Sequence, residues 1–215
     1  MGAYFHFGAT MSIKKSVYQI LICFTLIFTS SAFHHCADQS SDPQNMTSEQ
    51  VKGIIAEKAK EILTVLKKKN FSNLSEYVHP EKGVRISPYG YIDPENDREF
   101  KPQEIKQINQ DSTFFWGYED GTGDSIKLSI ADYFDNYVYD AKFLQVKKVG
   151  YQEIIQKGNT KINISEVYPK AIFVEYHFSG TDKHDGFDWR SLRLIFEKKD
   201  DTWYLVGISH DQWTI

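Results

Sequence analysis

Helical and strand-type hydrophobic patterns occupy opposite ends of the folded part of this sequence. Apolar residues recur at helical spacing from Val51 to Leu66, and Thr47 and Gln50 form the pattern of a capping box just before them. Alternating apolar and polar residues, which are typical of β-strands, fill segments 171–178, 191–197 and 203–210. The sequence therefore predicts an α+β fold, in which a long N-terminal helix packs on a curved, mainly antiparallel sheet.

Shorter elements are predicted between these two regions. Pro102 begins a short helix, and Ser129, followed by Asp132, caps another. The predicted strands lie at 84–87, 112–118 and 126–128, with turns at 119–124 and 198–202.

The N-terminus has the pattern of a secretory signal peptide. Lys14 and Lys15 precede a predominantly apolar run over 20–28, and small residues follow over 29–32. This run is short for a membrane span. Met11 is a better start than Met1, because residues 1–10 add an uncharged aromatic run before the n-region. We therefore expect an exported protein with a signal segment over 1–35, a polar tether over 36–46 and one globular domain over 47–215.

Two processing routes remain open after export. Small residues at Ser30 and Ala32 suit signal peptidase, whose cleavage would release a soluble periplasmic or secreted protein. Cys36 lies at a suitable distance for lipid attachment and precedes a polar stretch that resembles a lipoprotein tether. The preceding Phe33, His34 and His35 lack the small residue of a lipobox. An uncleaved anchor is the third alternative.

Cysteine positions restrict the chemistry of the predicted domain. Cys23 lies in the apolar run and Cys36 just after it, so residues 47–215 contain no cysteine. A disulfide framework, a cysteine-ligated zinc and a cysteine nucleophile are therefore excluded there.

The net charge and the glycine patterns indicate which partners and cofactors to expect. Without Lys14 and Lys15 the chain has 23 Lys and Arg against 29 Asp and Glu, so we expect no nucleic-acid partner. A membrane is expected only through the signal segment or a lipid anchor. No phosphate-binding loop is present, and we expect no cofactor. Asp120 and Asp124 flank glycines and are weak calcium candidates, but the full calcium-loop pattern is missing and a hairpin turn is the simpler interpretation.

Three residues are candidate catalytic groups. His210 lies beside Asp211 and could act as a general base, although adjacent strand residues face opposite sides. A half-buried structural histidine at the strand end is therefore the simpler interpretation. Asp188 could lie at the mouth of the sheet. His79 precedes Pro80, and a turn-stabilising role is favoured over acid–base chemistry.

Four residues are candidate binding groups: Trp116, Arg190, Arg193 and Glu175. Arg193 and Glu175 both face away from their apolar strand neighbours, so they could pair with each other or with a ligand. We favour a structural ion pair, because an unpaired buried charge is costly. Trp116 could line an aromatic cavity.

From Phe71 onward several motifs resemble those of a family of bacterial exported or lipid-anchored proteins. They lie at 78–85, 116–123, 158–160, 166–169, 174–178, 186–194 and 203–215. The order of elements also resembles the nuclear transport factor 2-like cone, in which helices cover the concave face of a bent sheet. The resemblance implies a shared fold and export, and it assigns no activity or catalytic residue.

Three hypotheses for the function follow. The first is a non-enzymatic envelope domain that binds a small molecule or an envelope protein through an aromatic-lined cavity or patch. The second is a hydrolase or isomerase that uses His210, Asp188 or His79 in a pocket. The third is a structural surface lipoprotein. An interior filled by aromatic side chains would favour a structural role, whereas convergent titratable groups in an open cavity would favour an enzyme.

Overall fold

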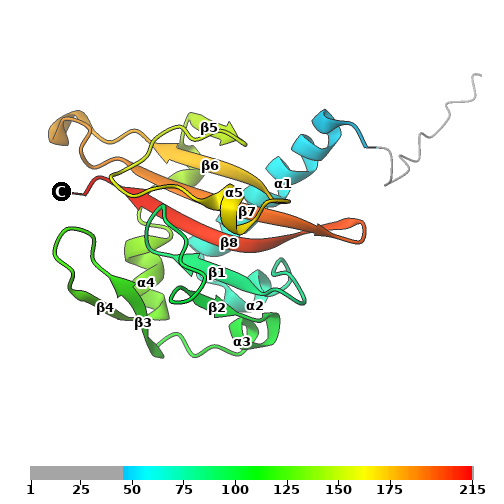
Figure 1. Cartoon of the computed structure of the whole chain (residues 1–215), viewed down its shortest axis with the longest axis horizontal. Helices are drawn as coiled ribbons and strands as arrows, with labels where there is room; N and C mark the ends of the chain where they lie inside the picture. The colour runs from blue at the N-terminus through cyan, green and yellow to red at the C-terminus, as the bar shows by residue number, and fades with distance from the viewer. Residues whose placement is uncertain (1–45, 215) are drawn as a thin grey trace, which may run out of the picture. The chain divides into compact units, whose positions relative to one another are not determined.

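A six-stranded sheet forms the centre of the computed structural model, which describes residues 46–214 (Figure 1). The strand order is β2-β1-β8-β7-β6-β5, and all neighbours are antiparallel except β1 and β8, which are parallel. The strands are β1 (Val84–Ser87), β2 (Arg98–Phe100), β5 (Lys148–Tyr151), β6 (Ile172–Phe178), β7 (Arg190–Lys199) and β8 (Thr202–Gln212). The predicted signal segment, the choice of Met1 or Met11 and lipidation at Cys36 lie outside the described residues.

The long helix α1 (Ser48–Lys67) begins at the predicted capping box. The Thr47 hydroxyl accepts from the Gln50 amide at 3.3 Å, and the Gln50 side chain accepts from the Thr47 amide at 2.7 Å. Each buried Ile or Leu of its apolar face contributes about 1.5–3 kcal/mol to stability. That face comprises Ile55, Ala59, Ile62, Leu63 and Leu66. No helix within residues 46–214 is both long and apolar enough to cross a membrane.

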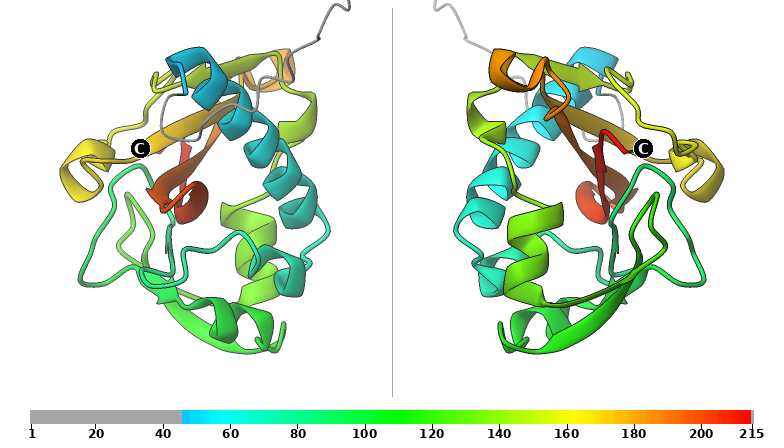
Figure 2. Two further views of the ribbon diagram at one scale, coloured as in Figure 1. Left: turned by 90° about the vertical axis from the view of Figure 1, so that its right-hand side faces the viewer. Right: turned by 90° about the vertical axis from the view of Figure 1, so that its left-hand side faces the viewer.

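Helices cover one face of the sheet. Figure 2 shows α1 and α4 (Ile130–Tyr137) on the same side of the sheet, with α5 (Ile164–Val167) on the other side. Leu192, Leu194 and Ile208 point from β7 and β8 into the core shared with α1 and α4. The shorter helices are α2 (Phe71–Leu74) and α3 (Pro102–Lys106), and the 3-10 turns are η2 (Phe143–Gln145) and η3 (Asp182–His184). The expected α+β fold, with a helix packed on a mainly antiparallel sheet, is confirmed.

The opposite face of the sheet is also covered. Ile195 and Val206 pack there against Ile92 and Ile164. The Tyr168 hydroxyl, from the same covering segment, donates to the Val206 carbonyl at 3.2 Å. Because segment 152–171 lies over this face, every residue over 191–197 of β7 and 205–211 of β8 is buried, including those with polar side chains. The alternating pattern had not predicted this second layer.

A separate two-stranded hairpin completes the fold. It consists of β3 (Thr113–Tyr118) and β4 (Ser125–Ser129), at the positions that the sequence predicts. Trp116 of β3 is fully buried, stacks on Tyr133 with ring centroids 3.8 Å apart, and donates from its indole nitrogen to the Leu128 carbonyl at 3.0 Å. Trp116 is therefore a core residue and does not line an open cavity. The space between the helices and the sheet is filled by aromatic side chains, among them Phe134, Phe143 and Tyr176.

Candidate functional site

A fully buried ion-pair network lies on the sheet face under segment 152–171. Arg193 of β7 pairs with Glu175 of β6 (Nε to Oε2, 2.9 Å) and with Asp211 of β8 (Nη1 to Oδ2, 3.0 Å). Arg193 and Glu175 are direct cross-strand neighbours. The exposed fractions of the three side chains are 0%, 0% and 1% in the order Arg193, Glu175, Asp211, so a ligand cannot reach them in this structure.

Backbone groups of the covering segment complete this network. The amides of Ile155 and Gln156 donate to Glu175, both at 3.2 Å, and the Gln156 carbonyl accepts from Arg193 at 2.6 Å. Burial raises the pKa of the Asp211 carboxyl, and the neighbouring Arg193 charge only partly offsets that rise. The network joins three strands to segment 152–158 and is structural.

A second buried cluster contains two of the predicted residues. His210 is fully buried, not half-buried, and its Nε2 lies 3.2 Å from Oδ2 of Asp140. Arg190 donates from Nε to the same oxygen at 2.6 Å. Burial alone would raise the pKa of the Asp140 carboxyl, but the hydrogen bonds and charges of His210 and Arg190 outweigh it and hold the pKa below its usual value. Asp140 was not anticipated from the sequence, because it lies 50 residues from Arg190 along the chain.

The remaining catalytic candidates have structural partners. Asp188 accepts hydrogen bonds from the amide and hydroxyl of Thr181 at 2.7 and 2.9 Å, which closes the loop around η3. His79 accepts at Nδ1 from the amides of Glu81 and Lys82, at 3.2 and 3.0 Å. Burial lowers the pKa of His79, which agrees with a neutral ring in the turn.

The structure brings some of these candidates together and leaves His79 apart. Asp188 and Arg190 line a hollow of about 430 Å³ together with Asp140, and His210 contacts Asp140. Within this hollow the Asp140 carboxylate is bonded to Arg190 and His210, and the Asp188 carboxylate to Thr181. His79 pairs near the Leu205 end of β8, roughly 15–20 Å along the strand from His210.

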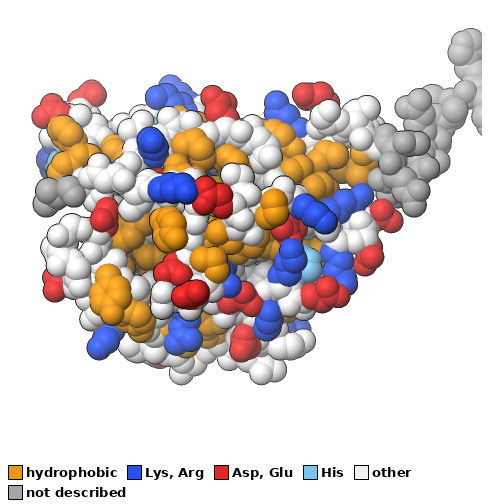
Figure 3. Space-filling view, in the orientation of Figure 1, with side chains coloured by type: hydrophobic (Ala, Val, Ile, Leu, Met, Phe, Trp, Pro, Cys, Tyr) orange, Lys and Arg blue, Asp and Glu red, His pale blue; other side chains and the backbone are white. Residues whose placement is uncertain are grey.

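A pocket between the segment after β1 and the β3–β4 hairpin has a different character. Its volume is about 340 Å³. Its aromatic walls are Tyr89, Tyr91, Phe115 and Tyr118. Its carboxylates are Asp93, Asp97, Glu119 and Asp120. We call this hollow the acidic aromatic pocket, and Figure 3 shows hydrophobic and acidic side chains together over this region of the molecule.

Tyrosine hydroxyls form the inner wall of the acidic aromatic pocket. Tyr89 donates to Glu119 at 2.8 Å, and Tyr137 of α4 donates to the other oxygen of the same carboxylate. Burial and the Glu119 hydrogen bond raise the pKa of both phenols, to about 12 for Tyr89. Both hydroxyls therefore stay protonated and act as donors at neutral pH.

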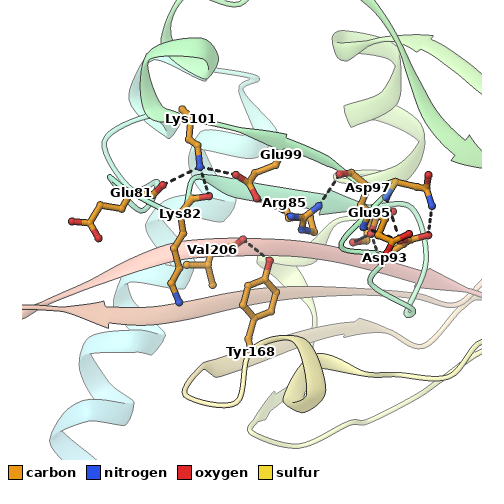
Figure 4. A network of polar contacts seen from close by, with 12 residues as sticks. Glu81, Lys82, Arg85, Asp93, Glu95, Asp97, Glu99, Lys101, Tyr168 and Val206 are labelled. Atoms are coloured by element: carbon orange, nitrogen blue, oxygen red, sulfur yellow. Dashed lines mark hydrogen bonds and ion pairs between the residues drawn. The ribbon is translucent and has the colours of Figure 1, made fainter.

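Asp97 is the most perturbed carboxyl of the pocket. Burial raises its pKa to about 6, against hydrogen bonds from the Ser87 hydroxyl and the Asp93 amide. The Asp93 carboxyl accepts from its own turn, mainly from the Asn96 side chain at 2.8 Å, and its pKa is lowered. Figure 4 shows Arg85 beside this turn, with Nη1 bonded to the Asp97 carbonyl at 2.9 Å and Nη2 to Glu99 at 2.8 Å.

The two predicted calcium candidates, Asp120 and Asp124, do not form a metal site together. The Asp120 carboxylate accepts from the Thr214 hydroxyl at 2.6 Å and lines the acidic aromatic pocket, while Asp124 lies exposed in the hairpin turn. Among residues 46–214, no three His, Cys, Asp or Glu side chains are placed to hold a metal ion.

A second hollow, larger than the acidic aromatic pocket, carries little chemistry. Its volume is about 750 Å³, and a single loop over 154–162 supplies all of its lining residues. Lys157 and Lys161 are its titratable side chains, and Lys161 is paired with Glu166 at the surface. We therefore place the candidate site at the smaller acidic aromatic pocket, where groups from three segments meet.

No family model matches this sequence, and no curated protein matches it. A crystal structure from Xanthomonas campestris, described as a calcium/calmodulin dependent protein kinase II association domain, matches with a TM-score of 0.33 and 13% identity. The match covers 83% of this chain and 96% of that chain. A TM-score this low carries no argument about the site or the function.

Proposed function

We propose that this chain is an exported, non-enzymatic binding domain whose small-molecule ligand occupies the acidic aromatic pocket. The observation that carries the proposal is the exposure of three aromatic rings around one hollow. Tyr91, Phe115 and Tyr118 are 48%, 37% and 63% exposed, although most other aromatic side chains of the domain lie in its core. Exposed apolar surface that lines a concave pocket with a few polar groups is typical of a ligand site.

The placement of the histidines argues against the enzyme alternative. His79 and His210 are buried at separate places, and none of the residues that line the acidic aromatic pocket is a histidine. Asp93 and Asp97 have pKa values displaced in opposite directions, as in acid–base pairs of enzymes. Both Asp93 oxygens accept from the residue's own turn, so this carboxylate is held as a structural group.

The aromatic filling of the interior supports a structural role for the core, and the pocket lies outside that core. A purely structural lipoprotein would need no pocket with exposed rings and carboxylates. This contrast supports the binding function over the structural alternative.

Ligand-dependent thermal stability tests the binding function. We expect a small molecule from a broad metabolite library to raise the melting temperature of the mature protein, since a ligand at 100 times its Kd adds about 2.7 kcal/mol. Tyr118→Ser should abolish the shift because it removes a pocket wall. Trp213→Ser is the matched control, since Trp213 is also an exposed aromatic residue but packs on Phe187 outside the pocket. A flat response of the parent protein, or a shift that survives Tyr118→Ser, would overturn the proposal.

Export is the second part of the proposal and rests on the order of charge, apolar run and small residues before residue 36. Intact mass of the protein from fractionated cells tests it. Cleavage before Cys36 with an added lipid mass, lost in Cys36→Ala, would establish the lipid-anchored route, and cleavage without added mass the soluble route. Finding the uncleaved chain in the cytosol would exclude export.

A further inference from the structure

The charge of the acidic aromatic pocket is strongly one-sided. Four carboxylates line it, and among the described residues of its wall none is Lys, Arg or His. Their hydrogen-bond donors are neutral hydroxyls, amides and a side-chain amide: Tyr89 and Tyr137 bond Glu119, and Thr214 bonds Asp120. Neutral donors stabilise a carboxylate but leave its charge in place, so the pocket carries a negative potential.

Arg85 offsets only part of this potential. After the Asn96 hydrogen bond, its charge helps to lower the pKa of Asp93, and it opposes the burial that raises the pKa of Asp97. Its nitrogens bond the Asp97 backbone carbonyl and Glu99, which lies on β2 outside the pocket. Lys101 bonds the carbonyls of Glu81 and Lys82 and the carboxylate of Glu99 (Figure 4). Lys127, the cross-strand neighbour of Phe115, is exposed and is not among the lining residues of the pocket.

The arrangement of the carboxylates does not suit a compact metal ion. A divalent cation needs several oxygens around one point, and no such set is present within residues 46–214. Here the carboxylates lie around a hollow of about 340 Å³ that also contains the rings of Tyr91, Phe115 and Tyr118. Aromatic faces attract organic cations through the quadrupole of the ring, and carboxylates add direct charge attraction.

We infer that the acidic aromatic pocket binds an organic cation, namely a primary amine or quaternary ammonium group carried on a small, partly apolar body. The cationic head lies among the carboxylates and the aromatic rings, and the apolar body lies toward Tyr91 and Tyr118. This inference rests on the proposed binding function and names its ligand class. The pocket volume lies at the lower end of the range for small-molecule sites, which limits the ligand to a compact molecule.

An isosteric series separates charge from shape. We would measure binding of choline, of its uncharged carbon isostere 3,3-dimethylbutan-1-ol and of anionic 3,3-dimethylbutanoate to the mature protein by calorimetry and ligand-observed NMR. We expect choline to bind roughly 10-fold or more tightly than the alcohol, and the anion to show no binding. Raising the salt concentration should weaken choline binding and leave the alcohol unaffected, because added ions screen charge attraction.

Variants locate the effect. Glu119→Gln removes one charge; its oxygen still accepts from one tyrosine hydroxyl, and its NH2 group can donate to the other. This variant should weaken choline binding about 10-fold without changing binding of the alcohol. Glu166→Gln is the matched control, because Glu166 is an exposed carboxylate paired with Lys161 away from the pocket. The salt experiment uses the parent protein and does not depend on any variant folding.

The outcomes separate this inference from the binding function. If the alcohol binds as tightly as choline, or if none of the three compounds binds while an uncharged or anionic library ligand is lost in Tyr118→Ser, the cation inference is wrong and the binding function stands. If no compound of any charge binds, both are wrong.

Discussion

Replacing Arg193 by Met should destabilise the protein severely, because two carboxylates would remain buried without a cation. Arg193 donates at 2.9 Å to Glu175, at 3.0 Å to Asp211 and at 2.6 Å to the Gln156 carbonyl. Removing one partner of a buried ion pair costs about 3–5 kcal/mol. That loss is a large fraction of the ~5–15 kcal/mol that stabilises a domain, and should lower the melting temperature by roughly 10 °C.

Urea unfolding followed by tryptophan fluorescence would measure this change. The matched control is Lys161→Met, which breaks the exposed Lys161–Glu166 pair and should cost about 1 kcal/mol or less. The deficit of Arg193→Met should also shrink as the pH falls. Burial raises the pKa of Asp211 even beside Arg193, and without that cation nothing opposes the rise, so stability is greatest at low pH and is lost as pH rises. A loss equal to that of the control, or a deficit that does not change with pH, would refute this reasoning.

Three further perturbations test other parts of the structure. Burial raises the pKa of Asp97 to about 6. The contribution of this carboxyl to stability is therefore present below its unfolded-state pKa and is lost as the pH rises through about 6. Asp97→Asn should remove this pH dependence of the free energy of unfolding, measured by urea titrations. His210 and Arg190 hold the pKa of Asp140 low despite its burial. The parent should therefore have a higher free energy of unfolding than Asp140→Asn above about pH 4, and this difference should fall at lower pH. A difference that grows on acidification would contradict the assignment. Thr47→Ala should lower the free energy of unfolding by about 1 kcal/mol in thermal melts, whereas an unchanged value would mean that the capping box adds nothing to α1.

Local patterns predicted the elements whose signals lie within a few residues. The capping box at Thr47, the cap at Ser129 and the hairpin between β7 and β8 are all found where the sequence predicts them. The short strands β2 and β5 and the helix α5 were not predicted, because three or four residues carry too little periodicity to identify an element. The parallel pairing of β1 with β8 joins residues about 120 positions apart and has no local signal.

The candidate site was only partly accessible to sequence reasoning. Sequence patterns favour the pairing of Arg193 with Glu175, because each residue faces away from its apolar strand neighbours and an unpaired buried charge is costly. They relate Asp211 only to His210 and to the chain end, whereas in the structure it is the second partner of Arg193. Glu119 and Asp97 gave no signal as pocket residues, since an acidic residue in a turn usually faces solvent.

The sequence by itself determined the α+β class, the long capped helix and the absence of thiol chemistry from residues 47–215, because these depend on residue type and on spacing within one element. Only the tertiary structure decided that the second sheet face is covered and that four carboxylates and three exposed rings surround one hollow. Such a site is assembled from chain segments that meet through packing across the sheet. Residues that lie far apart along the chain become neighbours there, and no local sequence pattern reports that proximity.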